Sequence, residues 1–309
     1  MKNYKVIFYS LMLSVVFTAC SKDDDSTDNT PKNVNSNVAM AAMSSQITGQ
    51  RNPSQITSLE FPKIKGENSI IIVHKAILNS RTGESGVNYS LEWDCSKKSQ
   101  RWSCYKMYAS INEKNTSRYY STTNQYPDDE SIPSQYRFES DPFWRSGYDH
   151  GHICPSADRL ASADANYQTF FMSNMQPQVN GFNAGVWGNM ENQLRTWNRN
   201  DFRDTLYVCK GGTIDNSSQI LTTTGKGLIV PKYFFMAILC KNSSGYKALG
   251  FWVEHQVNSD EDLGKYVVSI DDLEAKTGID FFCNLPDDIE NSVESLPVEN
   301  IKRAWGLNN

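Results

Sequence analysis

Residues 146–155 read SGYDHGHICP and contain two of the four histidines of the chain, His150 and His152. We expect an extended strand here, in which side chains two residues apart lie on the same face. The two imidazoles then share one face, and Asp149 and Gly151 lie on the other. Gly151 lets another segment or a ligand approach closely. An imidazole with an ordinary pKa of about 6.5 can take a proton from water at neutral pH, so the strand is a candidate site for general base catalysis.

Two other interpretations of the histidine pair stay open at this point. Both rings could bind one zinc ion, but a third ligand would have to come from His74, His255 or a distant carboxylate, and no zinc-like spacing supports this. The two histidines could also be ordinary side chains satisfied by hydrogen bonds within a sheet.

A second informative stretch follows, in which residues 170–178 read FFMSNMQPQ and residues 183–191 read NAGVWGNME. Asn183, Trp187 and Glu191 are four residues apart and therefore lie along one side of a predicted helix. The Asn183 amide can offer a neutral oxygen to a hard cation, and Glu191 can hold the waters of that cation. We interpret Trp187 as a packing residue. Asn183 alone could be a helix cap, but its pairing with a histidine-bearing strand favours a metal site.

Strand and helix patterns alternate along the rest of the chain. Residues rich in β-branched and aromatic side chains predict strands at 69–77, 87–93, 101–108, 205–208, 232–239 and 248–253. Apolar periodicity predicts helices at 163–172, 183–198, 270–277 and 286–292. The mixture predicts an α+β fold with a central, mostly antiparallel sheet flanked by helices.

The first residues have the layout of a secretory signal. Lys2 and Lys5 lead into an apolar run at 6–19, which predicts a signal peptide over 1–19. The run ends in FTAC at 17–20, which resembles a lipobox, so Cys20 is expected to carry lipid and to become the mature N-terminus. An ordinary signal peptide followed by an incidental cysteine is the alternative.

Behind Cys20 the sequence continues with SKDDD, which resembles the surface-export signal of Bacteroidetes lipoproteins, although it could be a plain solvated charge run. Residues 20–55 are rich in Asp, Asn, Ser and Thr and are expected to form a flexible tether. Residues 56–309 are expected to form the functional domain. We therefore expect an exported protein, held by lipid in the outer membrane and facing the cell exterior.

Charge and cysteine content set two further expectations. Without the signal peptide the chain has 28 basic and 35 acidic residues, a formal charge of −7, so any nucleic-acid site must be a local basic cleft. Six cysteines remain after Cys20, and an even number in an exported chain suggests disulfides. Cys95 and Cys104 flank a predicted hairpin turn and are the easiest pair to close.

Taken together, the two stretches resemble the DNA/RNA non-specific endonuclease family, the ββα-metal nucleases that include mitochondrial endonuclease G and secreted bacterial nucleases. The signature of that family is Asp-Arg-Gly-His, then Ser-Asn-x-x-Pro-Gln, then Asn-x-x-x-Trp-x-x-x-Glu. The matching residues are Asp149, Gly151, His152, Ser173, Asn174, Pro177, Gln178, Asn183, Trp187 and Glu191. Weaker matches at 228–232 and 278–282 extend the resemblance over most of 59–295.

The resemblance implies an endonuclease that hydrolyses DNA and RNA without sequence preference and leaves 5′-phosphate ends. It implies one Mg²⁺ or Mn²⁺ bound by Asn183 and waters, with Glu191 in contact with those waters. His152 would be the general base, and Asp149 and Asn174 would orient the site. Asp149, His150, His152 and Glu191 are thus the expected catalytic group.

Position 150 departs from the family pattern, which has arginine where this chain has His150. A histidine supplies positive charge only when protonated, so its expected contact with phosphate should weaken as pH rises. Further expected phosphate contacts come from Arg145 and Arg195, and Arg159, Arg199 and Arg203 are additional candidates. Alternatively, Arg195, Arg199 and Arg203 form an ordinary solvated helix face, and Arg159 is a structural ion-pair partner. The alternative function is a surface lipoprotein that binds nucleic acid or glycan without catalysis.

Overall fold

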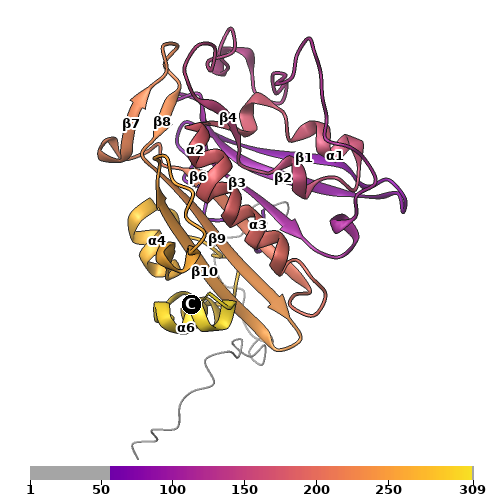
Figure 1. Ribbon diagram of the computed structural model, residues 1–309, viewed down its shortest axis with the longest axis vertical. Helices are drawn as coiled ribbons and strands as arrows, with labels where there is room; N and C mark the ends of the chain where they lie inside the picture. Colours follow the sequence, from indigo (N-terminus) through magenta and orange to yellow (C-terminus); the bar gives the residue numbers. More distant parts are fainter. Residues whose placement is uncertain (1–55, 308–309) are drawn as a thin grey trace, which may run out of the picture. The chain divides into compact units, whose positions relative to one another are not determined.

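The computed structural model describes residues 56–307, shown as a ribbon in Figure 1. The expected signal peptide at 1–19, the lipidation site Cys20 and the tether at 20–55 lie outside the described residues. Within the described range, no helix is long and apolar enough to span a lipid bilayer.

A seven-stranded antiparallel sheet forms the centre of the described part, with strand order β1-β2-β3-β6-β9-β10-β11. The strands are β1 (Ser69–Asn79), β2 (Glu84–Asp94), β3 (Ser99–Met107), β6 (Thr205–Gly212), β9 (Tyr233–Asn242), β10 (Gly245–Glu254) and β11 (Val267–Val268). All six strands predicted for this sheet are present, and each is within a few residues of its expected bounds. The α+β prediction is confirmed.

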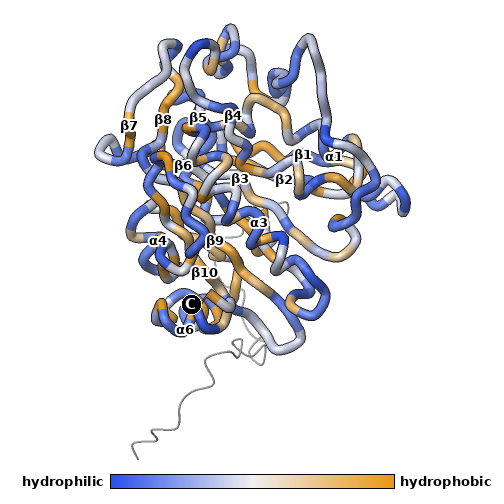
Figure 2. Tube along the Cα trace, viewed as in Figure 1, coloured by the Kyte–Doolittle hydropathy of each residue, from blue (hydrophilic) through white to orange (hydrophobic). Residues whose placement is uncertain are grey.

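Both faces of the sheet are buried, and β9 and β10 accordingly consist largely of apolar residues (Figure 2). Along β9, Phe234 and Met236 belong to one core cluster, whereas Phe235 and Ala237 belong to the other. This is the alternation expected of a strand covered on both sides. The first cluster includes side chains of α3 (Gly188–Trp197) and α6 (Val298–Trp305), and the second includes side chains of α4 (Ile270–Thr277) and α5 (Asp287–Glu294).

Helix predictions were right at 270–277 and nearly right at 286–292, and one helix was missed. The sequence analysis did not predict α6. The helix expected at 163–172 ends early, because α1 (Ala163–Gln168) is followed by a short 3-10 turn at Met172–Asn174. A separate hairpin, β7 (Ile220–Thr223) with β8 (Ile229–Pro231), lies apart from the main sheet (Figure 1).

The element that carries the chemistry is a two-stranded sheet followed by a helix. Strand β4 (Asp149–His152) pairs antiparallel with β5 (Met175–Gln178), and α2 (Asn180–Phe182) begins two residues later. The expected single helix at 183–198 is wrong at its start: a π-helical turn over Asn183–Trp187 separates α2 from α3, with non-helical dihedral angles at Gly185. A side chain at Gly185 would collide with the Asn258 carbonyl oxygen, 2.1 Å from an ideal Cβ position.

The disulfide expectation is wrong for the described cysteines, all six of which carry free thiols. Cys95 packs in the core cluster on one face of the sheet, whereas Cys104 packs in the cluster on the opposite face. The predicted Cys95–Cys104 pair therefore has its two sulfur atoms on opposite sides of the sheet.

Candidate active site

The β4-β5 pair sets the position of both histidines. Gly151 stands opposite Gln176 in this pair, and His152 stands opposite Met175. The side chain of Gln178 lies across the Gly151 backbone, where an added Cβ would be only 2.3 Å from the Gln178 Cδ. Glycine is therefore required at position 151 by close packing within the pair.

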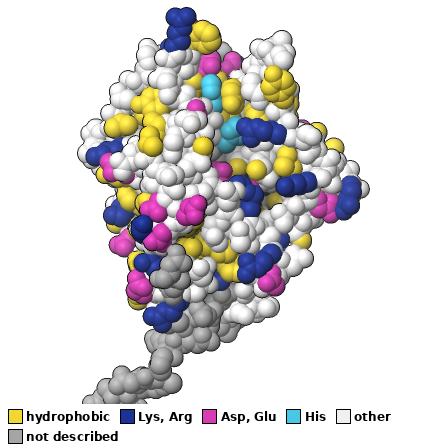
Figure 3. Space-filling model, viewed as in Figure 1, with side chains coloured by type: hydrophobic (Ala, Val, Ile, Leu, Met, Phe, Trp, Pro, Cys, Tyr) yellow, Lys and Arg dark blue, Asp and Glu magenta, His cyan; other side chains and the backbone are white. Residues whose placement is uncertain are grey.

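An open cavity of about 460 Å³ lies over this pair and the start of the following helical segment. Its lining includes Arg118, Tyr126, Tyr148, Asp149, His150, His152, Asn183 and Glu191. Figure 3 shows histidine side chains in this upper part of the molecule, with lysine and arginine side chains beside them. Of the candidates identified from the sequence, the four expected catalytic residues and Asn183 thus meet in one place.

Asp149 orients the amide of Asn183. Its Oδ2 accepts hydrogen bonds from the Asn183 side chain at 3.0 Å and from the Asn180 side chain at 2.9 Å. Because the Asn183 amide nitrogen is turned toward this carboxylate, the amide oxygen is left to face the cavity. Asp149 was expected on the strand face opposite the histidines, but at the first position of β4 it reaches the helical segment and joins the cavity.

Glu191 is held by a lysine that has no exposed side-chain surface. Lys210, on β6, donates to the Glu191 Oε1 at 2.7 Å. The Lys210 ammonium lies 4.8 Å from the centre of the Trp187 ring, and Trp187 is itself buried in the core, as interpreted from the sequence. Burial raises the pKa of Glu191, and the Lys210 charge acts against this rise. The pair fixes one carboxylate oxygen of Glu191 at the cavity wall.

His152 faces the cavity with a nitrogen that nothing in the described residues satisfies. Its Nε2 is shielded from solvent and has no hydrogen-bond partner there. Phe170 packs edge-on against the imidazole at 4.9 Å between ring centres. The pKa of His152 is lowered to about 3, mainly by burial and in part by the positive charge of Arg118, while a hydrogen bond to the His150 backbone acts in the opposite direction. The imidazole is therefore neutral at pH 7 and able to accept a proton.

His150 lies in an aromatic stack. The Tyr126 ring is parallel to it at 3.8 Å, and the Phe143 ring packs on it at 4.1 Å. Its Nε2 lies 3.2 Å from the Asp141 Oδ1. Burial lowers the pKa of His150, and Asp141 acts in the opposite direction. The expected contact of His150 with phosphate stays a prediction, since here the ring nitrogen faces a carboxylate.

The remaining candidates, which include Asn174, Arg145 and Arg195 as well as Arg159, Arg199 and Arg203, lie outside the cavity lining. Asn174 is buried, accepts from the Cys154 backbone N–H at 2.9 Å and donates to the Cys154 carbonyl at 2.8 Å, so it fixes the chain just beyond His152. Arg195 binds Asp158 at 2.9 Å, and exposed Arg145 lies over the Trp144 ring. Their roles in substrate binding also stay predictions.

The zinc interpretation does not fit the positions of the other two histidines. His74 pairs with Asp129 at 3.0 Å in a buried aromatic surrounding. His255 uses both ring nitrogens, with Nδ1 at 2.8 Å from the Pro231 carbonyl and Nε2 accepting from the Val179 N–H at 2.8 Å. His255 thereby anchors the residue that precedes α2, a positioning contact that the sequence analysis missed.

Sequence reasoning also missed Arg118, Tyr126 and Lys210. Arg118 is exposed, lies over the Phe170 ring at 4.7 Å and contributes to the cavity lining. It and Tyr126 come from the long segment between β3 and β4, where no periodic pattern marks functional residues. Lys210 did carry a signal, because a lysine inside an apolar strand must be paired when it is buried.

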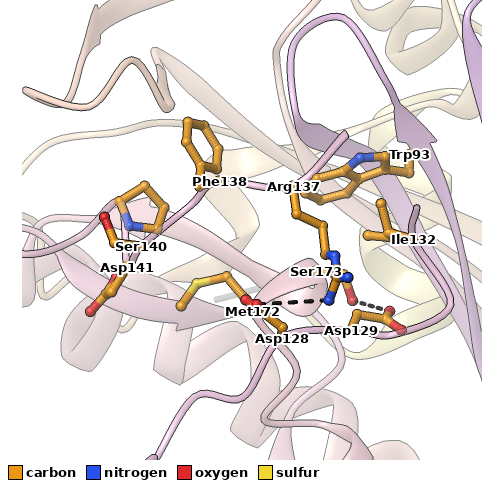
Figure 4. Close-up of a pocket in the computed structure, with 11 residues that line it drawn as sticks. Trp93, Asp128, Asp129, Ile132, Arg137, Phe138, Ser140, Asp141, Met172 and Ser173 are labelled. Carbon is orange, nitrogen blue, oxygen red and sulfur yellow. Dashed lines mark hydrogen bonds and ion pairs between the residues drawn. The ribbon is translucent and has the colours of Figure 1, made fainter. Parts of the chain in front are cut away.

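A second, smaller pocket borders this site and is drawn in Figure 4. It is lined by Trp93, Asp128, Arg137, Phe138 and Asp141, among others, and its volume is about 20 Å³. Such a space holds about one water molecule. It is therefore too small to be a nucleic-acid site, and its link to the chemistry is Asp141, which holds His150.

Comparisons with known proteins agree with this geometry. The family model for DNA/RNA non-specific endonucleases matches residues 73–288. A nuclease from Nostoc is 32% identical over 217 residues, covering 67% of this chain and 75% of that protein. Human mitochondrial endonuclease G is 28% identical over 170 residues, covering 52% of this chain and 57% of that protein.

Among solved structures, the chain is similar to endonuclease G in its complex with the inhibitor EndoGI, with a TM-score of 0.56 and 24% sequence identity. The match covers 64% of this chain and 84% of the other chain, and it supports the fold. Residues of the first and third motifs line one cavity, and the family match covers most of the described residues, so geometry and sequence similarity lead to the same assignment. The chain belongs to the DNA/RNA non-specific endonuclease family and is a nuclease.

Proposed function

We propose that the chain is a metal-dependent endonuclease that hydrolyses phosphodiester bonds of DNA and RNA and leaves 5′-phosphate ends. One observation carries the proposal. His152, whose Nε2 has no hydrogen-bond partner in the described residues, and Asn183, whose amide is turned by Asp149, line the same cavity. A candidate base and a candidate oxygen ligand for a hard cation therefore line one cavity, and this supports the proposal.

The residues present fit a divalent cation. Asn183 offers a neutral amide oxygen, and Glu191 lines the same cavity with one oxygen fixed by Lys210 and the other available to hold waters. We propose Mg²⁺ or Mn²⁺ as the ion. When bound, it would stabilise negative charge on the phosphate and on the departing oxygen.

In this proposal His152 is the general base. Its Nε2 accepts a proton from water as the water oxygen forms a bond to phosphorus and the bond from phosphorus to the 3′ oxygen breaks. The departing 3′ oxygen then takes a proton from solvent. Arg118, exposed at the cavity edge, supplies positive charge to the phosphate. Asp149 keeps the Asn183 amide in place, and the Lys210 charge opposes the rise that burial causes in the pKa of Glu191.

The test is plasmid nicking by His152→Ala with Mg²⁺, Mn²⁺ or EDTA present. Loss of a placed general base should lower the rate by roughly 10²–10⁴ while the melting temperature stays within a few degrees of wild type. Added imidazole should restore part of the activity. Unreduced cleavage by a folded variant would disprove the assignment of the base. Binding of nucleic acid by wild type without any cleavage would favour the binding-only alternative.

Export and lipid anchoring form a separate proposal. The charge and hydropathy pattern of residues 1–25 supports a lipoprotein held in the outer membrane through Cys20 and exposed at the cell surface. Protease treatment of intact cells should degrade the wild-type protein. Cys20→Ala should leave the membrane fraction. Retention of that variant in the membrane fraction would argue against the lipid anchor.

A further inference from the structure

Three carboxylates converge on the opposite face of the main sheet from the nuclease cavity. Asp271 and Glu274 lie one turn apart on α4, and Glu294 is the last residue of α5. One oxygen from each lies within 4.8 Å of the others. Helices α4 and α5 pack on the core cluster on that side of the sheet, whereas α3, behind the cavity, packs on the other (Figure 1 labels α3 and α4).

The most buried member of this group has no compensating partner. Glu294 is only 6% exposed, and its Oε1 is shielded from solvent without a hydrogen-bond donor. Within residues 56–307, no lysine or arginine forms an ion pair with any of the three carboxylates. The nearby Lys63 instead pairs with Asp280 at 3.4 Å. An unpaired buried carboxylate is costly, so the site calls for a cation or a proton.

Helix geometry makes the charge at Glu294 still less favourable. Glu294 lies at the C-terminal end of α5, where the helix dipole is negative and repels a carboxylate. Burial, together with the neighbouring carboxylates, Glu274 first, raises the pKa of Glu294 to about 9. Burial likewise raises the pKa of Glu274 to about 7. A divalent cation bound between these carboxylates would offset their mutual repulsion.

We propose that Asp271, Glu274 and Glu294 bind one calcium ion that ties α4 to α5. Two oxygens that each lie about 2.4 Å from a calcium ion are at most about 4.8 Å apart. The three carboxylate oxygens all lie within 4.8 Å of one another, so they are close enough to share one ion. Asp271 is exposed, so one side of the site is open to the waters that complete a coordination shell. Calcium accepts such irregular sets of oxygens, whereas magnesium demands near-ideal octahedral geometry.

The site is partly organised before any ion arrives. The Glu274 Oε1 accepts a hydrogen bond from the Phe281 backbone N–H at 2.6 Å, which fixes this carboxylate against the chain that follows α4. Glu294 is held by the packing of α5, whose Val293 is fully buried in the core cluster on this face. Calcium would therefore bind a site with two constrained ligands and one adjustable ligand, and it would stabilise the packing of α5. This role is independent of cleavage.

The experiment measures calcium binding and thermal stability of the full chain, with no magnesium present. Modest sites with three carboxylates bind with a Kd of about 10⁻⁴–10⁻³ M, so titration calorimetry should detect one such event. Addition of 10 mM CaCl₂ should raise the melting temperature by roughly 3–10 °C. Glu294→Gln should fold, lose the calcium response and melt at or above the calcium-free wild-type temperature, because it removes repulsion.

Matched variants decide where the ion binds. Asp272→Asn removes an exposed carboxylate from the same turn of α4 and should keep the full response. Asn183→Ala should also keep it, whereas Asp271→Asn should weaken calcium binding at least tenfold. A response that persists in Glu294→Gln and Asp271→Asn, or that disappears in Asn183→Ala, would overturn the proposal. So would a wild-type melting temperature that calcium does not change, which would mean that the cluster holds a proton instead.

Discussion

Replacement of Lys210 by methionine should destabilise the protein far more than the loss of an ordinary lysine. The Lys210 side chain has no exposed surface, and its ammonium lies 2.7 Å from the Glu191 carboxylate and 4.8 Å from the Trp187 ring centre. Methionine fills a similar volume, so the main change is that Glu191 loses its buried counter-charge. Breaking a buried ion pair from one side costs about 3–5 kcal/mol, and we expect a loss of that size at pH 8.

The loss should depend on pH in a defined direction. Burial already raises the pKa of Glu191, and Lys210 is the strongest influence that lowers it, so the variant raises this pKa further. A carboxyl whose folded pKa exceeds its unfolded value binds more protons in the folded state. Its contribution to stability is therefore fully present at low pH and is lost as pH rises through the folded pKa. The variant should be closer to wild type at pH 5 than at pH 8.

Urea unfolding at both pH values measures this effect, and Lys247→Met is the matched control. Lys247 is also buried, but it donates to the Ala304 carbonyl at 2.8 Å, so its loss leaves only a neutral group unpaired. The control should lose about 1–2 kcal/mol with little pH dependence. A double variant, Lys210→Met with Glu191→Gln, should recover much of the stability. A Lys210→Met loss below about 1 kcal/mol at pH 8, or a larger loss at pH 5, would refute the reasoning.

Three further predictions concern the cavity. His150→Arg should increase the plasmid-nicking rate above about pH 7.5. A guanidinium stays charged at this pH, whereas burial lowers the pKa of His150 and keeps its ring neutral. If the rate does not increase, position 150 does not touch the substrate. Gly185→Ala should lower the free energy of unfolding by about 1–3 kcal/mol, because the added methyl group clashes with the Asn258 carbonyl. Gly225→Ala is the control and should not lower it, because the space around Gly225 is open. Equal melting temperatures of the two variants would contradict this prediction. NMR titration of the metal-free protein should show a neutral His152 ring down to about pH 4, because burial lowers its pKa to about 3. A titration midpoint near pH 6.5 would mean that the His152 ring is not buried as the structure shows.

The sequence predicted the main sheet well because each predicted strand contains β-branched or aromatic residues. The segments at 232–239 and 248–253 are mostly apolar, whereas those at 87–93 and 101–108 mix apolar with polar residues. Helix boundaries were less predictable. The π-helical turn at Asn183–Trp187 depends on Gly185 packing against the Asn258 carbonyl, a contact between segments more than seventy residues apart. Local periodicity contains no information about that contact.

The candidate site shows the same division between local and distant determinants. His152, Asn183 and Glu191 could be found because their motifs are contiguous and keep fixed spacing. The partners that determine their chemistry could not, because Asp141 and Arg118 come from a segment without a regular pattern and Lys210 from a strand of the main sheet. The disulfide prediction failed for a related reason: cysteine spacing near a turn does not reveal which face of the sheet each sulfur occupies.

The negative net charge of the chain was the main compositional argument against a nucleic-acid substrate. The charges at the cavity reduce the weight of this argument. Affinity for phosphate depends on the few cations that reach it rather than on the total charge. Lys210 and Arg195 are each paired with a carboxylate, but Arg118 forms no ion pair with any residue in the described range and stands exposed at the cavity edge. With Asn183 contributing a neutral ligand, a divalent ion would keep most of its positive charge for the substrate. In the proposed function, Arg118 and a bound divalent ion would together supply the local positive charge that the chain as a whole lacks.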